Sequence, residues 1–132
     1  MAFNGNFLIK VGNYTIPLTY MKLESYQSSP DQRQDLDSYR DADGLLHRTV
    51  LAHTATKIEF ETPYLVIADM QNLIQGIRRN YTEEISRTCT LNYYDDETDS
   101  YKTGTFYLPG TMTFQLYNKE IYAPSRFAFI EY

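Results

Sequence analysis

One segment in the middle of the chain has the periodicity of a helix. Between positions 63 and 79, apolar side chains recur every three or four residues, as on the buried stripe of an α-helix. Thr62 suits the N-cap, and Pro63 suits the first helical position, where a missing N–H costs no hydrogen bond. Arg78 and Arg79 lie in the last turn, where cations interact favourably with the helix dipole. The pattern predicts one amphipathic helix, about residues 63–79, that closes one flank of a β structure.

Alternating polar and apolar residues dominate the sequence before and after this helix. Residues 55–61 alternate strictly, and so do residues 87–94, which the acidic connection 95–100 joins to a partner run over 101–108. Gly12-Asn13 lies between the first two apolar runs and fits a type II′ hairpin turn. Further strands are expected at residues 7–11, 14–18 with a possible extension over 19–21, 45–52, 111–117, 120–122 and 126–132. We predict a mainly β (α+β) fold, an antiparallel β-sandwich or barrel of about seven to nine short strands with one helix.

A long polar segment interrupts this pattern. Residues 24–43 contain too few apolar side chains to contribute a core, which predicts a long exposed loop. Its end includes Leu36 and Tyr39 at strand-like positions, and Asp43-Gly44 is a turn signature. The segment is therefore interpreted either as an exposed loop or as a protruding hairpin with Asp43-Gly44 at its tip.

The length and the net charge of the chain limit the classes of protein to which it can belong. A chain of 132 residues predicts one domain, residues 1–132. The net charge of −5, with 12 basic residues that are mostly scattered, argues against a protein that grips nucleic acid. It is compatible with a surface past which DNA slides. The amino-terminal residues lack the features of a signal peptide, and no apolar run approaches the roughly 20 residues of a membrane span.

Residues able to bind metals do not form a recognisable motif. His47 and His53 are the only histidines, and their spacing of six residues predicts solvated strand side chains better than a metal site. The acidic residues 95–99 lack the glycine and glutamate of a calcium loop and are interpreted as a solvated hairpin turn. We therefore predict no metal, no cofactor and no catalytic residue.

The single cysteine is assigned to the core, and the many tyrosines are assigned to cross-strand packing or to contacts between subunits. Cys89 shares the parity of Leu91 and Tyr93, which predicts a small core residue and excludes an intramolecular disulfide. Thirteen tyrosines are present, several beside the predicted strands. Cross-strand packing and a subunit interface explain them equally well, and an aromatic sugar-binding platform is a weaker third interpretation.

Three stretches resemble a family of small tail proteins encoded in phages and prophages of Gram-positive hosts. Residues 40–48 are similar to the family's Arg-x-Ala-x-Gly turn before a basic strand, and residues 57–65 to its strand that runs through Pro-Tyr-Leu into the helix. Residues 91–95 followed by 101–107 resemble its hairpin with Tyr-Asp before the acidic turn and Thr-Gly-x-Phe-Tyr after it. The resemblance spans roughly residues 40–132.

The resemblance implies a structural role in a virion. Tail-tube and distal-tail proteins have a β-sandwich or barrel flanked by one helix, and they form rings that are often six-fold. The loop at residues 24–43 would then be an arm between subunits, and an acidic lumen would let DNA pass. Candidate interface residues come from this loop and from strand-flanking tyrosines: Tyr26, Arg33, Asp35, Tyr39, Arg40, Asp43, Tyr94, Tyr101, Tyr117 and Tyr122.

We predict a non-enzymatic component of a bacteriophage tail, of tube or baseplate/distal-tail type, made in the host cytoplasm and carried in the virion tail. Its expected partners are other copies of itself, in a ring, and neighbouring tail proteins, with no membrane and with DNA only passing through. A receptor- or carbohydrate-binding β-sandwich is the first alternative. A hydrolase with two carboxylates about 5–10 Å apart is the second.

Overall fold

The computed structural model of the chain describes residues 3–132. In that range it has one α-helix, α1 (Ile67–Arg78), and two 3-10 helices, η1 (Leu18–Tyr20) and η2 (Leu23–Ser25). The strands are β1 (Ile9–Val11), β2 (Tyr14–Thr15), β3 (Gln27–Gln32), β4 (Asp35–Arg40), β5 (Leu46–Val50), β6 (Ala55–Glu61), β7 (Leu65–Val66), β8 (Tyr81–Glu83), β9 (Thr88–Asp95), β10 (Ser100–Tyr107), β11 (Ile121–Tyr122) and β12 (Arg126–Glu131). Of these 12 described strands, seven have five or more residues. Of the five shorter ones, β1, β2 and β11 lie in segments predicted as strands, whereas β7 and β8 were not predicted.

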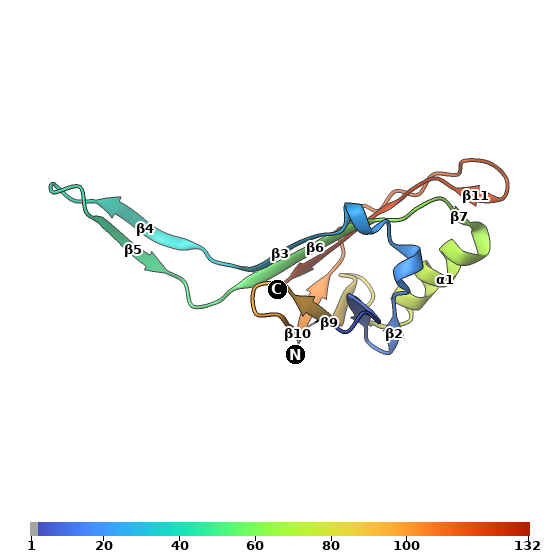
Figure 1. The fold of residues 1–132 in the computed structure, drawn as a ribbon, viewed down its shortest axis with the longest axis horizontal. Helices are drawn as coiled ribbons and strands as arrows, with labels where there is room; N and C mark the ends of the chain where they lie inside the picture. The colour runs from blue at the N-terminus through green and yellow to red at the C-terminus, as the bar shows by residue number, and fades with distance from the viewer. Residues whose placement is uncertain (1–2) are drawn as a thin grey trace.

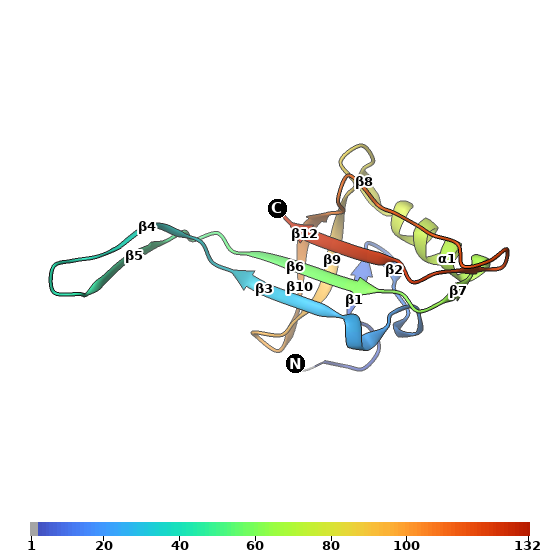
Figure 2. The same cartoon turned by 90° about the horizontal axis from the view of Figure 1, so that it is seen from above.

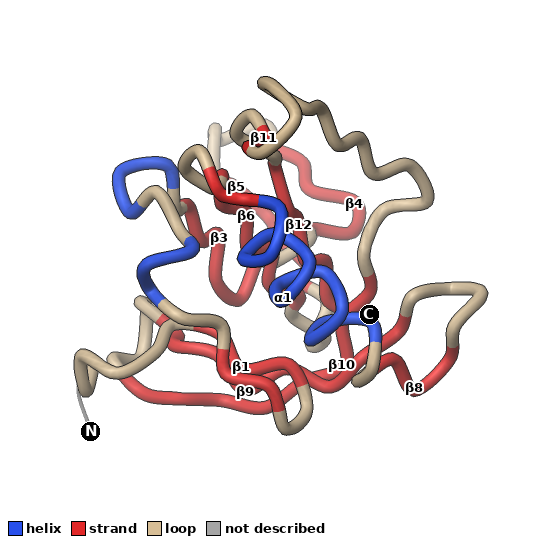
Figure 3. The backbone as a smooth tube through the Cα atoms, turned by 90° about the vertical axis from the view of Figure 1, so that its right-hand side faces the viewer, coloured by secondary structure: helices blue, strands red, loops and turns tan. Residues whose placement is uncertain are grey.

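Eight of the strands form one antiparallel sheet. Its order is β2-β1-β9-β10-β12-β6-β3, and β8 pairs with β9 beside this path. The β9–β10 hairpin pairs continuously from Thr88 with Tyr107 to Asp95 with Ser100, as predicted. Figure 3 shows the sheet curled, so that β1 and β9 lie on one side of the core and β3 and β6 on the other. The predicted mainly β, antiparallel fold with one helix is confirmed.

The core lies inside this curl and is closed by α1. Four phenylalanines are at its centre, and the ring of Phe60 stacks on that of Phe127 at a centroid distance of 5.4 Å. Leu73 and Ile77 of α1 belong to the same buried cluster. The alternation predicted for β6 and β9 is confirmed, including Cys89, whose burial raises the pKa of its thiol to about 11. The cysteine is therefore a core residue with little thiolate at neutral pH.

The helix begins four residues later than predicted. Leu65 and Val66 pair with β11 in extended conformation, and α1 starts at Ile67 without a side-chain cap. The hydroxyl of Thr62 accepts a hydrogen bond from the backbone N–H of Ser125 at 3.0 Å and is fully buried. The predicted N-cap was wrong because pairing with the segment before β12 satisfies Thr62 and extends the residues that follow it.

The predicted loop at residues 24–43 is mostly strand. Residues 27–32 form β3, which pairs with β6 at the edge of the main sheet through backbone hydrogen bonds that need no apolar side chains. Residues 35–40 form β4 and pair with β5, and a turn over residues 41–44 joins the two strands. The interpretation of a protruding hairpin with Asp43-Gly44 at its tip is confirmed, whereas the exposed loop was wrong.

The predicted strand over residues 111–117 and the possible strand extension over residues 19–21 are absent from the described chain. Residues 18–20 form η1, and residues 111–117 run as irregular chain with one isolated bridge from Leu116 to Tyr122. Met112 and Phe114 pack against the core, whereas Leu116 is 54% exposed. The predicted Gly12-Asn13 hairpin is present, and positive φ at Gly12 alone agrees with a type II′ turn.

Gly76 offers a test of how α1 packs on the amino-terminal hairpin. A Cβ at this position would lie 2.6 Å from the ring of Tyr14. We expect Gly76→Ala to lower the free energy of unfolding by about 1–2 kcal/mol, because crowding outweighs the gain in helix propensity. Thermal and urea unfolding followed by circular dichroism measure this. Asn72→Ala, at an exposed position of α1, is the control and should be neutral or slightly stabilising. Gly76→Ala in a Tyr14→Ala background should stabilise, and a loss of stability there would contradict the explanation.

Candidate assembly interface

The hairpin of β4 and β5 forms an arm that leaves the body. We define the arm as residues 33–54; β4 and β5 pair with each other in a two-stranded sheet, and every residue in both strands is exposed. Figures 1 and 2 show the arm continuing the direction of β3 and β6 far beyond the sheet. At about 3.3 Å per residue, residues 34 to 42 reach roughly 25 Å. An isolated two-stranded hairpin is marginally stable in water, so the arm lacks a stabilising partner within the described residues.

The two faces of the arm differ in chemistry. Leu36 pairs with Thr49 and Tyr39 with His47, so these side chains share one face, where the rings of Tyr39 and His47 stack at 4.9 Å. Leu36 is 50% and Tyr39 59% exposed. The opposite face carries the ion pair between Asp35 and Arg48 at 2.8 Å, and the hydrogen bonds from Arg48 hold the pKa of Asp35 below its usual range. One arm face is thus aromatic and the other carries the ion pair, and exposed apolar side chains lie on both faces, because Leu46 and Val50 share the face of Arg48.

The arm tip is fixed by Asp41. One carboxylate oxygen accepts hydrogen bonds from the backbone N–H groups of Asp43 and Leu45, each at 3.0 Å. The other oxygen contacts Nε2 of His47 at 2.8 Å, and this contact is the main cause of the lowered pKa of Asp41. His53 instead contacts the carbonyl oxygen of Tyr132 at 2.8 Å. No cluster of three metal-ligating side chains occurs in the described part of the chain.

A polar cluster fixes the base of the arm. Asp31 has a positive φ of 49° at a register shift in β3, and its N–H donates to the Thr56 hydroxyl at 3.1 Å. Nζ of Lys102 lies 3.4 Å from Asp31 and 3.0 Å from the fully buried Asp95. Arg33 donates to Glu97 in the β9–β10 turn at 2.8 Å. The expectation of a solvated acidic turn was wrong for Asp95, which also accepts hydrogen bonds from turn N–H groups.

The two aspartates at the base have opposite pKa shifts. The hydrogen bond to Asp95 and burial raise the pKa of Asp31. Burial acts to raise the pKa of Asp95, but hydrogen bonds from Asp31, Lys102 and the turn outweigh it and leave that pKa lowered. The lowered pKa of Asp95 means that its ionised side chain stabilises the fold at pH values above its unfolded pKa, and this contribution is lost as the pH falls through its folded pKa. The raised pKa of Asp31 means that its neutral side chain is the stabilising form, so its contribution is lost as the pH rises through its folded pKa.

This arrangement predicts a pH-dependent effect of Asp31→Asn. The amide can still donate to Asp95 and removes one of two adjacent carboxylates, and Asn tolerates positive φ. We expect the melting temperature to rise by a few degrees at pH 7. The difference from the wild type should shrink as the pH falls through the raised pKa of Asp31, because the wild-type side chain then becomes neutral. Circular dichroism melts between pH 3 and 8 measure this. Asp43→Asn at the exposed tip has the same charge change and should show no difference; a lower melting temperature for Asp31→Asn at pH 7 would refute the argument.

Nine of the ten candidate interface residues occupy three separate regions, and the tenth packs on the core. Four of them lie along β4 and at the tip, and Arg33 lies at the base: Arg33, Asp35, Tyr39, Arg40 and Asp43. Tyr94 and Tyr101 face each other across β9 and β10 at a ring distance of 5.7 Å. Tyr117 and Tyr122 lie at the opposite end of the molecule from the arm. Tyr26 packs on the core, and burial raises the pKa of its hydroxyl. Their role in an interface stays a prediction.

A second exposed apolar surface lies where β7 and β11 pair. We call it the β7–β11 end and define it by Tyr64, Val66, Leu116 and Tyr117. The rings of Tyr64 and Tyr117 meet edge to face at 5.2 Å, and Leu116 and Tyr117 are 54% and 65% exposed. The interface candidates predicted from the sequence include Tyr117 of this surface and Tyr122 of β11, but not Val66 or Leu116, because Val66 lies in the apolar stripe of the predicted helix and Leu116 in a predicted strand. Pro63, Pro109-Gly110 and Pro124 are local signs of irregular chain there.

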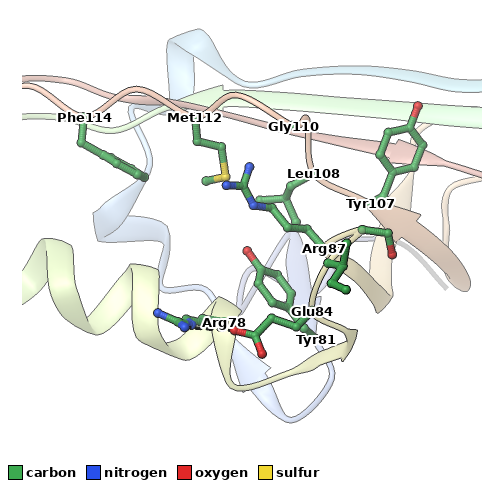
Figure 4. Close-up of a pocket in the computed structure, with 11 residues that line it drawn as sticks. Arg78, Tyr81, Glu84, Arg87, Tyr107, Leu108, Gly110, Met112 and Phe114 are labelled. Atoms are coloured by element: carbon green, nitrogen blue, oxygen red, sulfur yellow. Dashed lines mark hydrogen bonds and ion pairs between the residues drawn. The ribbon is translucent and has the colours of Figure 1, made fainter.

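A cavity of about 550 Å³ opens beside the carboxyl end of α1. Figure 4 shows Tyr81, Arg87 and Met112 around it, together with Arg78 and Glu84. Glu84 is the one carboxylate in its lining, and it pairs with Arg78 at 3.0 Å. The hydrolase alternative requires two carboxylates across a cleft, which this lining does not supply.

The fold is shared with a protein of an assembled tail. The chain is similar to a solved structure described as "Tail of empty GTA particle computed with helical refinement, C6 symmetry", with a TM-score of 0.56 and 16% identity, over 99% of this chain and 95% of that chain. At this identity the similarity establishes a common fold. The chain belongs to a family of unknown function, DUF6711, which matches residues 1–132. No curated protein matches it.

Within residues 3–132, no helix combines the length and the apolarity that crossing a membrane requires.

Proposed function

We propose that residues 1–132 form a single tail-tube-like domain and act as a structural, non-enzymatic subunit of a phage or prophage tail of a Gram-positive host. The subunit is of tube, baseplate or distal-tail type and works in the virion tail after synthesis in the host cytoplasm. Its partners are other copies of itself in a ring, hexameric by analogy with the C6-symmetric particle, and neighbouring tail proteins.

The arm is the observation that carries this proposal. Both of its strands are exposed along their whole length, and exposed apolar side chains lie on both of its faces. In an isolated domain, an exposed hairpin of this kind adds little to the stability of the fold. The hairpin becomes more stable when another chain covers its apolar side chains. The shared fold with a tail protein supports a subunit of an assembly as that other chain.

The sheet edges and the charge are also consistent with a ring. β2 and β3 end the order of the main sheet, so each leaves backbone groups that a neighbouring chain can pair with. Pro30 in β3 limits unspecific pairing at that edge. The net charge of −5 suits a tube wall that repels DNA and lets it pass.

Assembly of the purified protein tests the proposal. We expect sedimentation velocity to reveal species much larger than the 15.5 kDa chain as the concentration rises, and negative-stain electron microscopy to show rings or stacked rings. A chain that stays monomeric at all concentrations, both alone and with isolated tails of the producing phage, would refute the proposal. Specific binding to an oligosaccharide by such a monomer would instead support the carbohydrate-binding alternative.

A further inference from the structure

The first described residues form a short strap over the β9–β10 hairpin. We define the strap as residues 3–7, which belong to no helix or strand. The ring of Phe3 meets that of Tyr94 edge to face at 5.7 Å, and the ring of Phe7 lies 4.8 Å from that of Tyr101. Contacts with these two tyrosines therefore hold the strap against the hairpin.

The strap contains the sequence Asn4-Gly5, in which a backbone nitrogen can attack the preceding side chain. Gly5 has no side chain to hinder its nitrogen, and no other atom lies within 4 Å of the place that a Cβ would occupy. Its N–H donates no hydrogen bond within the described residues. Of the seven asparagines in the chain, Asn4 is the only one followed by glycine. Asn4 is therefore the asparagine most open to this attack.

Hydrogen-bond donors surround the side-chain carbonyl oxygen of Asn4. Its Oδ1 accepts a hydrogen bond from the backbone N–H of Asn6 at 2.8 Å, and the hydroxyl of Tyr101 donates to the same oxygen at 2.9 Å. Attack by the Gly5 nitrogen places negative charge on this oxygen, and donors that already point at it stabilise that charge. Because the two reacting groups belong to adjacent residues, ring formation needs no second molecule.

We propose that Asn4-Gly5 is a site of spontaneous covalent modification, at which Asn4 converts to aspartate and isoaspartate. The Gly5 nitrogen forms a bond to Cγ of Asn4, the bond from Cγ to Nδ2 breaks, and Nδ2 leaves as ammonia with the proton of the Gly5 N–H. Water then opens the cyclic imide at one of its two carbonyl carbons. Opening at Cγ gives aspartate, and opening at the backbone carbon gives isoaspartate. The reaction needs no other copy of the chain, so it is independent of the proposed function.

The conversion should loosen the strap. Isoaspartate adds one atom to the main chain between Phe3 and Gly5, which displaces the Phe3 ring relative to Tyr94. Both products also add a negative charge beside a hairpin that already carries Asp99, whose carboxylate accepts a hydrogen bond from the Tyr94 hydroxyl at 2.6 Å. Like charges repel each other, so the modified strap is held less firmly. Tyr94 and Tyr101, two of the candidate interface residues, then become more exposed.

Mass spectrometry of the purified chain tests the site. During incubation at mildly alkaline pH, we expect the intact mass to rise by the difference between an amide and an acid, and peptide mapping to place the change at Asn4. Asn118 is the internal control: two backbone N–H groups donate to its Oδ1, at 2.8 and 3.0 Å, but Lys119 follows it. Asn4 should react at least about tenfold faster than Asn118. Asn4→Gln should stay unchanged over the same period, because its longer side chain would have to close a larger ring.

A second comparison tests whether a free glycine nitrogen matters. Asp43-Gly44 at the arm tip also has a glycine, but the N–H of Gly44 donates to the carbonyl oxygen of Asp41 at 2.9 Å. Isoaspartyl methyltransferase, which labels isoaspartate, should therefore label the peptide with residue 4 well before the peptide with residue 43. Equal rates at Asn4 and Asn118, or earlier labelling of the arm tip, would refute the proposed site.

Limited proteolysis tests the effect on the strap. Anion exchange separates the modified chain by its added charge, and chymotrypsin should cleave it after Phe7 at least about threefold faster than the unmodified chain, because a loosened strap fits the protease more often. Asn4→Gln, aged in the same way, should keep the slow cleavage. Equal cleavage of the modified and unmodified chains would show that the strap survives the conversion and would overturn this part of the proposal.

Discussion

Removal of the arm is expected to abolish assembly and to leave the body folded. Gln32 and Ala55 are paired neighbours at the end of β3 and β6, so an Asn-Gly turn can replace residues 33–54 and close the hairpin. No residue of the two removed strands is buried. The deletion also removes the ion pair between Arg33 and Glu97, which is exposed and contributes less than about 1 kcal/mol to the free energy of unfolding. The melting temperature should therefore change by only a few degrees.

Sedimentation velocity and circular dichroism measure the two parts of this prediction. The armless protein should sediment as a monomer at concentrations where the wild type forms large species. Arg48→Ala removes one charge from the arm and keeps its exposed apolar and aromatic side chains, so this variant is the matched control and should assemble. If the armless body still assembles, the sheet edges alone hold the copies together and the arm has another purpose. If it unfolds, the arm supports the body in a way that its exposure does not indicate.

Loss of the Asp95 carboxylate is expected to have the largest effect on the stability of the body. This side chain is fully buried, contacts Lys102 at 3.0 Å and accepts hydrogen bonds from the N–H groups of Glu97 and Thr98. Asp95→Ala leaves those donors unpaired, which should lower the free energy of unfolding by about 2–4 kcal/mol. Urea unfolding at pH 7 measures the loss.

The neighbouring Asp96 supplies the control. Its side chain is exposed in the same turn, so Asp96→Ala makes the same change in charge and should cost less than about 0.5 kcal/mol. The difference between the two variants should shrink as the pH falls below the unfolded pKa of Asp95, because protonation removes the advantage of the wild type. Equal effects of the two substitutions at pH 7 would mean that the turn holds its shape without the buried carboxylate.

The parts of the fold that the sequence predicted are those with a simple periodicity. β6 and β9 were found because one face of each strand is buried and the other is not, which imposes a period of two. β10 has no such alternation in burial and was found as the partner run after the acidic turn. The helix was found from its stripe, but its start was misplaced, because Thr62 and Pro63 have the chemistry of a helix start and a distant segment holds them extended. Local signals cannot reveal such a partner.

The candidate site was predicted in outline and missed in detail. The Asp43-Gly44 turn and the polar segment before it indicated the arm, since turn chemistry is local. The burial of Asp95 was missed because only the folded chain places Lys102 and Asp31 beside it. At the β7–β11 end, Tyr117 was a predicted candidate, but Val66 and Leu116 were missed for the opposite reason, because their pattern is that of core residues and the structure leaves them exposed.

The sealed position of Cys89 has a consequence for the lifetime of the protein. A thiol with a pKa of about 11 is almost entirely protonated at neutral pH, and this one has no exposed surface. Oxidants attack the thiolate, so this thiol should resist oxidation and disulfide exchange. Subunits with such a sealed cysteine should form no disulfide crosslinks during long storage in air, without any reducing system to protect them.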